Sequence, residues 1–131
     1  MEWIEIFGVF VVSHLAGDYL LQTEWQARHK RGGLGHDPVS RRALISHIAT
    51  YGLAFVPAFV WLADEMGAVV LGIAVLILLP HLVQDDGRPV SAYISAIKGA
   101  VADADDFLFT AVDQSFHLIA LFLVALVAAS Q

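Results

Sequence analysis

The chain has 131 residues, of which 58% are hydrophobic and only 15% are charged. A soluble domain of this size cannot hide so much apolar surface, so the composition excludes an ordinary soluble protein. It predicts a single integral membrane domain, residues 1–131. Without cysteine, disulfides and thiolate metal ligands are excluded. The formal net charge is −6, and nucleic acid is not an expected partner.

Four apolar segments of about 20 residues follow one another along the chain, and a helix of that length spans the roughly 30 Å hydrocarbon core of a bilayer. The second and third segments are joined by Asp64–Met66 alone, so their helices must be antiparallel neighbours. The predicted fold is therefore an all-α, up-down bundle of four transmembrane helices. The predicted helices cover residues 3–22, 43–63, 67–85 and 107–129.

The two longer connections are polar. In the first, residues 23–42, Ser40 is the expected N-cap of the second helix. The second contains an amphipathic stretch, Ser91 to Val101, with Ile94 and Ile97 on its apolar face. This pattern predicts a short helix that lies on the membrane surface between the third and fourth helices.

All basic residues lie in these two connections. Lysine and arginine concentrate in cytoplasmic loops, so the bias predicts that both connections face the cytoplasm and both termini lie outside it. The expected location is therefore a membrane that borders the cytoplasm, with the lipid bilayer as the immediate partner. The basic residues are Arg28, Lys30, Arg31, Arg41, Arg42, Arg88 and Lys98.

Histidine and aspartate recur inside the predicted helices at a spacing of four, which places both side chains on one helical face. Ionisable side chains within a membrane are costly and mark functional sites. Every predicted helix contributes one histidine, and all of these residues fall within about 15 Å of the cytoplasmic boundary. They are His14 and Asp18, His47, His81 and Asp85, and Asp113 and His117.

An up-down bundle would bring these seven residues to one interior site. Imidazole and carboxylate groups ligate divalent metals, so the site is predicted to bind zinc, with manganese or iron as alternatives. Seven side chains exceed the four ligands of one zinc ion. Either two ions bind, or one ion binds and the spare carboxylates orient histidines or act as bases. The competing interpretation is that these groups only join helices by hydrogen bonds.

These motifs resemble the family of small bacterial and phage membrane proteins catalogued as domain of unknown function 3307. The resemblance covers essentially the whole chain. The family usually has a lysine where this chain has Arg88, which keeps the charge but not a titratable amine. Its histidine–aspartate helices are similar to those of inner-membrane metal-dependent hydrolases. The resemblance therefore implies a location in the inner membrane of a bacterium and a metal site, but it names no substrate. The matching runs are His14-x-x-x-Asp18-x-x-x-Gln22-Thr23-x-Trp25 followed by Lys30, Leu44-x-x-His47-x-x-x-Tyr51, His81-x-x-x-Asp85, and Asp113-Gln114-x-x-His117.

The first hypothesis for function is a metal-dependent hydrolase of an amphiphilic or lipid-linked substrate. Asp18 or Asp113 would act as the general base for a water that the metal activates. Basic residues near the site would hold a phosphate group. The residues expected to bind substrate or orient ligands are Gln22, Lys30, Arg88 and Gln114, with Arg28 and Arg31 as further phosphate-binding groups.

Two other functions stay open at this point. Ion or proton transport would use the same residues as a pathway, although they occupy only one half of the membrane. A haem-binding or purely structural membrane anchor would use paired histidines, whereas the aspartates favour a harder metal. The sequence alone leaves open whether the protein is an enzyme.

Overall fold

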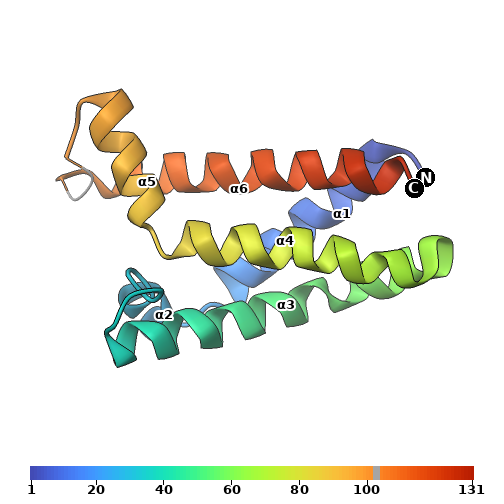
Figure 1. Ribbon diagram of the computed structural model, residues 1–131, viewed down its shortest axis with the longest axis horizontal. Helices are drawn as coiled ribbons and strands as arrows, with labels where there is room; N and C mark the ends of the chain where they lie inside the picture. The colour runs from blue at the N-terminus through green and yellow to red at the C-terminus, as the bar shows by residue number, and fades with distance from the viewer. Residues whose placement is uncertain (102–103) are drawn as a thin grey trace.

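The computed structural model describes residues 1–101 and 104–131, which form helices and connections and contain no strand. Four longer helices lie along the long axis of the molecule (Figure 1). They are α1 (Trp3–Leu15), α3 (Pro38–Met66), α4 (Val70–Asp85) and α6 (Asp106–Ala129). The shorter elements are the π-helix η1 (Ala16–Leu20), α2 (Glu24–His29), the 3₁₀-helix η2 (Gly67–Val69), α5 (Arg88–Tyr93) and the π-helix η3 (Ile94–Lys98).

The four longer helices alternate in direction. α1 and α4 run toward the end of the molecule that carries α2 and α5, whereas α3 and α6 run away from it (Figure 1). Both termini therefore lie at the opposite end. α1 contacts α3 and α6, and α4 contacts the same two helices. Each long helix thus has two long neighbours, and the four surround a common interior.

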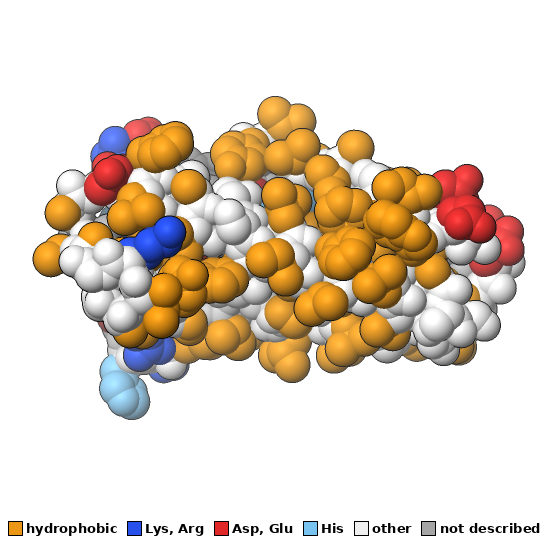
Figure 2. All heavy atoms as spheres, turned by 90° about the horizontal axis from the view of Figure 1, so that it is seen from above, with side chains coloured by type: hydrophobic (Ala, Val, Ile, Leu, Met, Phe, Trp, Pro, Cys, Tyr) orange, Lys and Arg blue, Asp and Glu red, His pale blue; other side chains and the backbone are white. Residues whose placement is uncertain are grey.

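Among the described residues, three helical stretches are long and apolar enough to cross a membrane: Trp3–Leu20, Pro38–Asp85 and Asp106–Ala129. The middle stretch has 48 residues and holds both α3 and α4, so it covers the second and third predicted segments. Apolar side chains also cover much of the face that Figure 2 shows. Leu20 and Leu71 are among the exposed apolar residues of the molecule. Length, composition and this outward apolar surface indicate a membrane protein.

Helix α3 begins earlier than predicted because a different residue caps it. The Asp37 carboxylate accepts a hydrogen bond from Ser40 N at 2.9 Å, and Pro38 occupies the first helical position. Both are strong helix-start signals. Hydrogen bonds from the Ser40 hydroxyl and backbone lower the pKa of Asp37. The prediction of Ser40 as the N-cap was therefore wrong, since Ser40 lies in the first turn and donates to the true cap.

The first polar connection contains α2, which the hydropathy pattern did not reveal. Thr23 Oγ1 accepts from Gln26 N at 3.1 Å, and Gln26 Oε1 accepts from Thr23 N at 3.0 Å. This reciprocal capping box starts the helix. Gln26 Nε2 also donates to Ser46 Oγ at 3.2 Å, which fastens α2 to α3. Because this contact holds α2 against α3, Lys30, the residue that follows α2, lies at the end of the interior between the long helices.

The second long connection holds α5 and η3, where one short helix is predicted. Ile94 is fully buried, and the apolar residues packed around it and Val90 include Leu108 and Phe116 of α6. Ile97, by contrast, is 66% exposed. The apolar face of this segment is thus divided: part of it packs on α6, and part of it faces outward.

Candidate metal centre

Four histidines, one from each longer helix, meet in the interior. None has more than 2% of its surface exposed. The ring centres lie 4.6 Å apart for His81 and His117, 5.3 Å for His47 and His81, and 5.2 Å for His14 and His117. The structure therefore brings together the histidines that the sequence places at one depth.

Two aspartates join them. Asp18 Oδ1 lies 3.1 Å from His47 Nε2 and 3.3 Å from His81 Nε2. Asp85 Oδ2 lies 2.7 Å from His47 Nε2 and 3.1 Å from His81 Nε2. Both carboxylates are nearly completely buried. The six side chains are called the His/Asp cluster below: His14, Asp18, His47, His81, Asp85 and His117.

The separations within this cluster are those of ligands around a cation. His47 Nε2 has His81 Nε2 at 3.2 Å in addition to its two carboxylate oxygens. An imidazole nitrogen carries at most one proton, so these contacts cannot all be hydrogen bonds. A tetrahedral zinc site with bonds of about 2.0–2.1 Å separates its ligand atoms by roughly 3.3 Å. Five of the six separations among the facing atoms of Asp18, His47, His81 and Asp85 are 2.7–3.3 Å, close to this value, so these four atoms could ligate one divalent ion.

His117 is oriented as a metal ligand. Its Nδ1 lies 2.7 Å from the Asp113 backbone carbonyl, which can only accept, so Nδ1 carries the proton. In the neutral ring the lone pair is then on Nε2, which lies 3.1 Å from Asp85 Oδ1. Among the described residues neither of these two buried atoms has a hydrogen-bond partner. Two acceptors at this distance are compatible with a cation between them.

Two overlapping sets of ligands result. One atom each from Asp18, His81, Asp85 and His117 lies within 4.8 Å of the other three. The second set consists of His47 with Asp18, His81 and Asp85, so the two sets share three residues. Since the two oxygens of Asp85 face different histidines, this carboxylate is placed to bridge two positions. The group of Asp18, His81, Asp85 and His117 could therefore hold a metal ion.

A hydrogen-bond chain fixes the orientation of Asp18. The Tyr51 hydroxyl donates to His14 Nδ1 at 3.0 Å, and His14 Nε2 donates to Gln114 Oε1 at 2.8 Å. Gln114 Nε2 then donates to Asp18 Oδ2 at 3.1 Å. Oδ1 of Asp18 is thereby turned toward His47 and His81. Both ring nitrogens of His14 are occupied by protein groups, in contrast to His117.

Tyr51 is a residue of this site that the sequence analysis names only as the end of the run that begins at Leu44 and gives no role. Its ring stacks on His81 with centres 3.5 Å apart and planes 8° apart. A Cβ on Gly17 would lie 2.6 Å from Tyr51 Cδ2, so only glycine permits this approach of η1 to α3. π-helical turns such as η1 are frequent at functional sites. The signal for Tyr51 was its spacing of four from His47.

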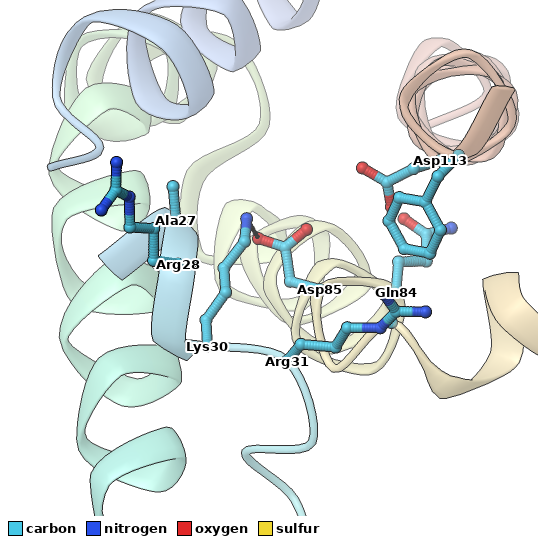
Figure 3. A pocket seen from close by; sticks show the side chains of 9 residues that line it. Ala27, Arg28, Lys30, Arg31, Gln84, Asp85 and Asp113 are labelled. Atoms are coloured by element: carbon cyan, nitrogen blue, oxygen red, sulfur yellow. Dashed lines mark hydrogen bonds and ion pairs between the residues drawn. The ribbon is translucent and has the colours of Figure 1, made fainter. Parts of the chain in front are cut away.

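Lys30 reaches the cluster from the end of α2. Its Nζ lies 2.8 Å from Asp85 Oδ2 and donates to Gln22 Oε1 at 2.6 Å, and Figure 3 shows the contact with Asp85. Gln22 Nε2 in turn donates to the Asp18 backbone carbonyl at 3.2 Å. The structure therefore places both Gln22 and Lys30 beside the cluster.

Asp113 lies at the edge of the cluster, with 14% of its side chain exposed. Its Oδ1 is 3.6 Å from His117 Nδ1, and Gln114 Nε2 lies 3.4 Å from its Oδ2. Asp113 and Asp85 line a cavity of about 240 Å³. Arg28, Lys30 and Arg31 also line it (Figure 3). The cavity connects the edge of the cluster with the basic end of the molecule.

Arg88 lies away from the cluster. Its guanidinium forms a two-point ion pair with Asp86, with Nε–Oδ1 and Nη2–Oδ2 distances of 2.5 and 3.0 Å. Asp86 Oδ2 also accepts from Leu34 N at 2.8 Å. Burial alone would raise the pKa of Asp86, but these hydrogen bonds hold it below its usual value. The pair anchors the loop that follows Lys30.

The fold and the cluster together define a class: an all-helical protein with apolar stretches long enough to span a membrane and a buried histidine–aspartate centre that could hold a metal ion. The chain belongs to the family described as Protein of unknown function (DUF3307), whose model matches residues 6–131. The match includes every residue of the His/Asp cluster and confirms the family predicted from the motifs. No curated protein and no solved structure matches the chain.

Proposed function

We propose that the protein is a bundle of four membrane-spanning helices that holds one or two divalent metal ions in the His/Asp cluster and hydrolyses an amphiphilic substrate. The observation that carries the proposal is the spacing of 2.7–3.3 Å among the Nε2 atoms of His47 and His81 and the carboxylate oxygens that face them. Mixed imidazole and carboxylate ligands favour zinc, with manganese and iron as alternatives.

Charge balance supports a bound ion. Asp18, Asp85 and Asp113 bring three negative charges to the site, and Lys30 returns one positive charge. A divalent ion makes the sum zero when the histidines are neutral. Uncompensated charge in a protein interior or a membrane is strongly disfavoured, so the excess of carboxylates favours a cation there.

The placement of Asp113 supports hydrolysis. A bound divalent ion would lower the pKa of a nearby water. Asp113 faces the cavity next to the cluster, so it is placed to accept the proton of that water. Asp18 is more enclosed, and Gln114 already donates to one of its oxygens. We therefore assign the general base to Asp113 in preference to Asp18.

The other functions fit the site less well. The rings of His81 and His117 are in contact, at 4.6 Å between centres, which leaves no slot for a porphyrin between them. Beyond the cluster, apolar residues such as Phe55 and Leu62 fill the interior, so the polar residues do not continue as a path for ions or protons.

The experiment that tests hydrolysis compares wild type with Asp113→Asn in detergent. The substrates are chromogenic esters with alkyl chains, one set carboxylic and one set phosphoric. We expect hydrolysis that a chelator abolishes and zinc restores, and an Asp113→Asn protein that keeps its metal but loses about 100-fold or more in rate. His29→Ala, outside the cluster, is the control. Hydrolysis that persists in chelator, or metal-loaded protein inactive on every ester, would contradict the assignment.

Orientation in a bacterial inner membrane is the second part of the proposal. The basic end of the molecule would face the cytoplasm, and both termini would face away from it. A reporter enzyme that works only outside the cytoplasm, fused after Gln131, should be active. A stable fusion that is inactive there, but active with a cytoplasmic reporter, would reverse the orientation.

A further inference from the structure

The cavity beside the cluster has two chemically different walls. Asp85, a member of the His/Asp cluster, and Asp113, the proposed general base, stand on the side of the cluster. Arg28, Lys30 and Arg31 stand on the side of α2 and the loop after it. A ligand in this space would meet a metal ion on one side and basic side chains on the other. Oxyanions are the groups that both sides attract.

The basic wall is held in place by neighbouring residues. The Arg31 guanidinium lies 4.5 Å from the centre of the Phe109 ring and donates to Ser91 Oγ. Lys30 is held between Gln22 and Asp85. Arg28 pairs with Glu24 at 2.6 Å, but both side chains are more than 70% exposed. Such an exposed pair contributes little stability, so Arg28 can exchange Glu24 for an anionic ligand at small cost.

The size of the cavity restricts what it encloses. Sites that enclose a drug-sized molecule have volumes of roughly 300–1,000 Å³. A volume of about 240 Å³ suits a headgroup and not a whole amphiphile. The remainder of a larger ligand would have to lie outside the cavity.

Resting on the proposed metal centre, we propose that this cavity binds a phosphate monoester group, with its oxygens shared between the metal side and the basic wall. The guanidinium groups of Arg28 and Arg31 and the Lys30 ammonium would attract the negative charge of such a group. Arg88, two-point paired with Asp86 outside the cavity, takes no part.

The test measures binding of three probes to the purified, zinc-loaded protein: dihexanoyl phosphatidate, dihexanoylglycerol and inorganic phosphate. The variant is Arg28→Gln with Arg31→Gln. The matched control is Arg41→Gln with Arg42→Gln, which removes the same charge from the same end but outside the cavity. We expect the phosphatidate to bind and the double variant to weaken it about tenfold or more, with the control near wild type.

The probes separate the sources of the phosphate group. Phosphatidate binding tighter than that of inorganic phosphate assigns the site to a lipid headgroup, and equal binding assigns it to the phosphate alone; both support the cavity. Equal binding of phosphatidate and dihexanoylglycerol, or equal losses in the two double variants, overturns it. Zinc content is measured on the same samples. Phosphate binding that depends on Arg28 and Arg31 in a protein without metal supports the cavity and overturns only the metal centre.

Discussion

The interior of the molecule has two halves, and the same four helices build both. In the half toward the termini the helices contribute only apolar residues, among them Ile6, Phe10, Phe55, Leu62, Ile73 and Leu121. In the half toward α2 they contribute the His/Asp cluster. All buried histidines and carboxylates in the described part of the chain lie in this second half. In α1 the buried residues change from apolar to ionisable within one helical turn, from Phe10 to His14.

This difference separates stability from chemistry. The apolar half can join four helices by close packing alone. The loss of stability on substitution there is set by the side-chain volume that is removed. The cluster half is held by hydrogen bonds and charges whose partners come from distant parts of the chain. Tyr51 stands at the border, because its ring packs on Phe55 at 4.9 Å on one side and on His81 on the other. Predictions about the two halves should therefore differ in kind.

The largest effect is expected for metal binding when Asp85 is removed. Asp85 faces His47, His81 and His117, so Asp85→Ala takes a ligand from both sets. Metal affinity should fall by more than the roughly 10–100-fold typical of losing a supporting residue. Elemental analysis and a competitive zinc indicator would measure it. Asp64→Ala, at the far end of α3, should retain wild-type affinity, and similar losses in both variants would contradict a localised site.

A substitution in the apolar half should lower the stability of the protein and leave its metal content unchanged. Phe55 is fully buried, and Phe55→Ala should reduce the free energy of unfolding by about 3–5 kcal/mol through lost packing and a new cavity. Unfolding in mixed detergent would measure it, with Leu53→Ala, 66% exposed on the same helix, as the control. The folded Phe55→Ala protein should keep its metal content. Loss of metal from the folded variant would show that the halves are coupled.

The smallest effect is the loss of stability expected at the border between the two halves, where Gly17 lies against Tyr51. Gly17→Ala places a methyl group 2.6 Å from the Tyr51 ring, and such overpacking typically costs about 1–3 kcal/mol. Gly8→Ala is the matched control in α1, because a Cβ there meets nothing within 4 Å. Thermal unfolding of the two variants in detergent should separate them. Equal stability of the two variants would mean that η1 and α3 can move apart without a loss of folding free energy.

Much of the cluster could be predicted because its pattern is local. A spacing of four places His81 with Asp85 on one face, and the depth of each helix aligns the histidines. The approximate helix positions followed from hydropathy in the same way, although Asp37 and not Ser40 caps α3. What local patterns cannot show is pairing across the chain. Tyr51 with His14 and Lys30 with Asp85 are separated by 37 and 55 residues, and no periodicity records such contacts.

The central claim is that the His/Asp cluster holds metal, and X-ray absorption on the zinc-loaded protein tests it most directly. We predict one or two zinc ions per chain with nitrogen and oxygen ligands at about 2.0–2.1 Å and the outer-shell scattering of at least two imidazoles. The imidazole signal should weaken in His81→Ala and stay unchanged in His29→Ala. A wild-type protein that retains no stoichiometric zinc, manganese or iron, or bound zinc without imidazole scattering, would contradict the account.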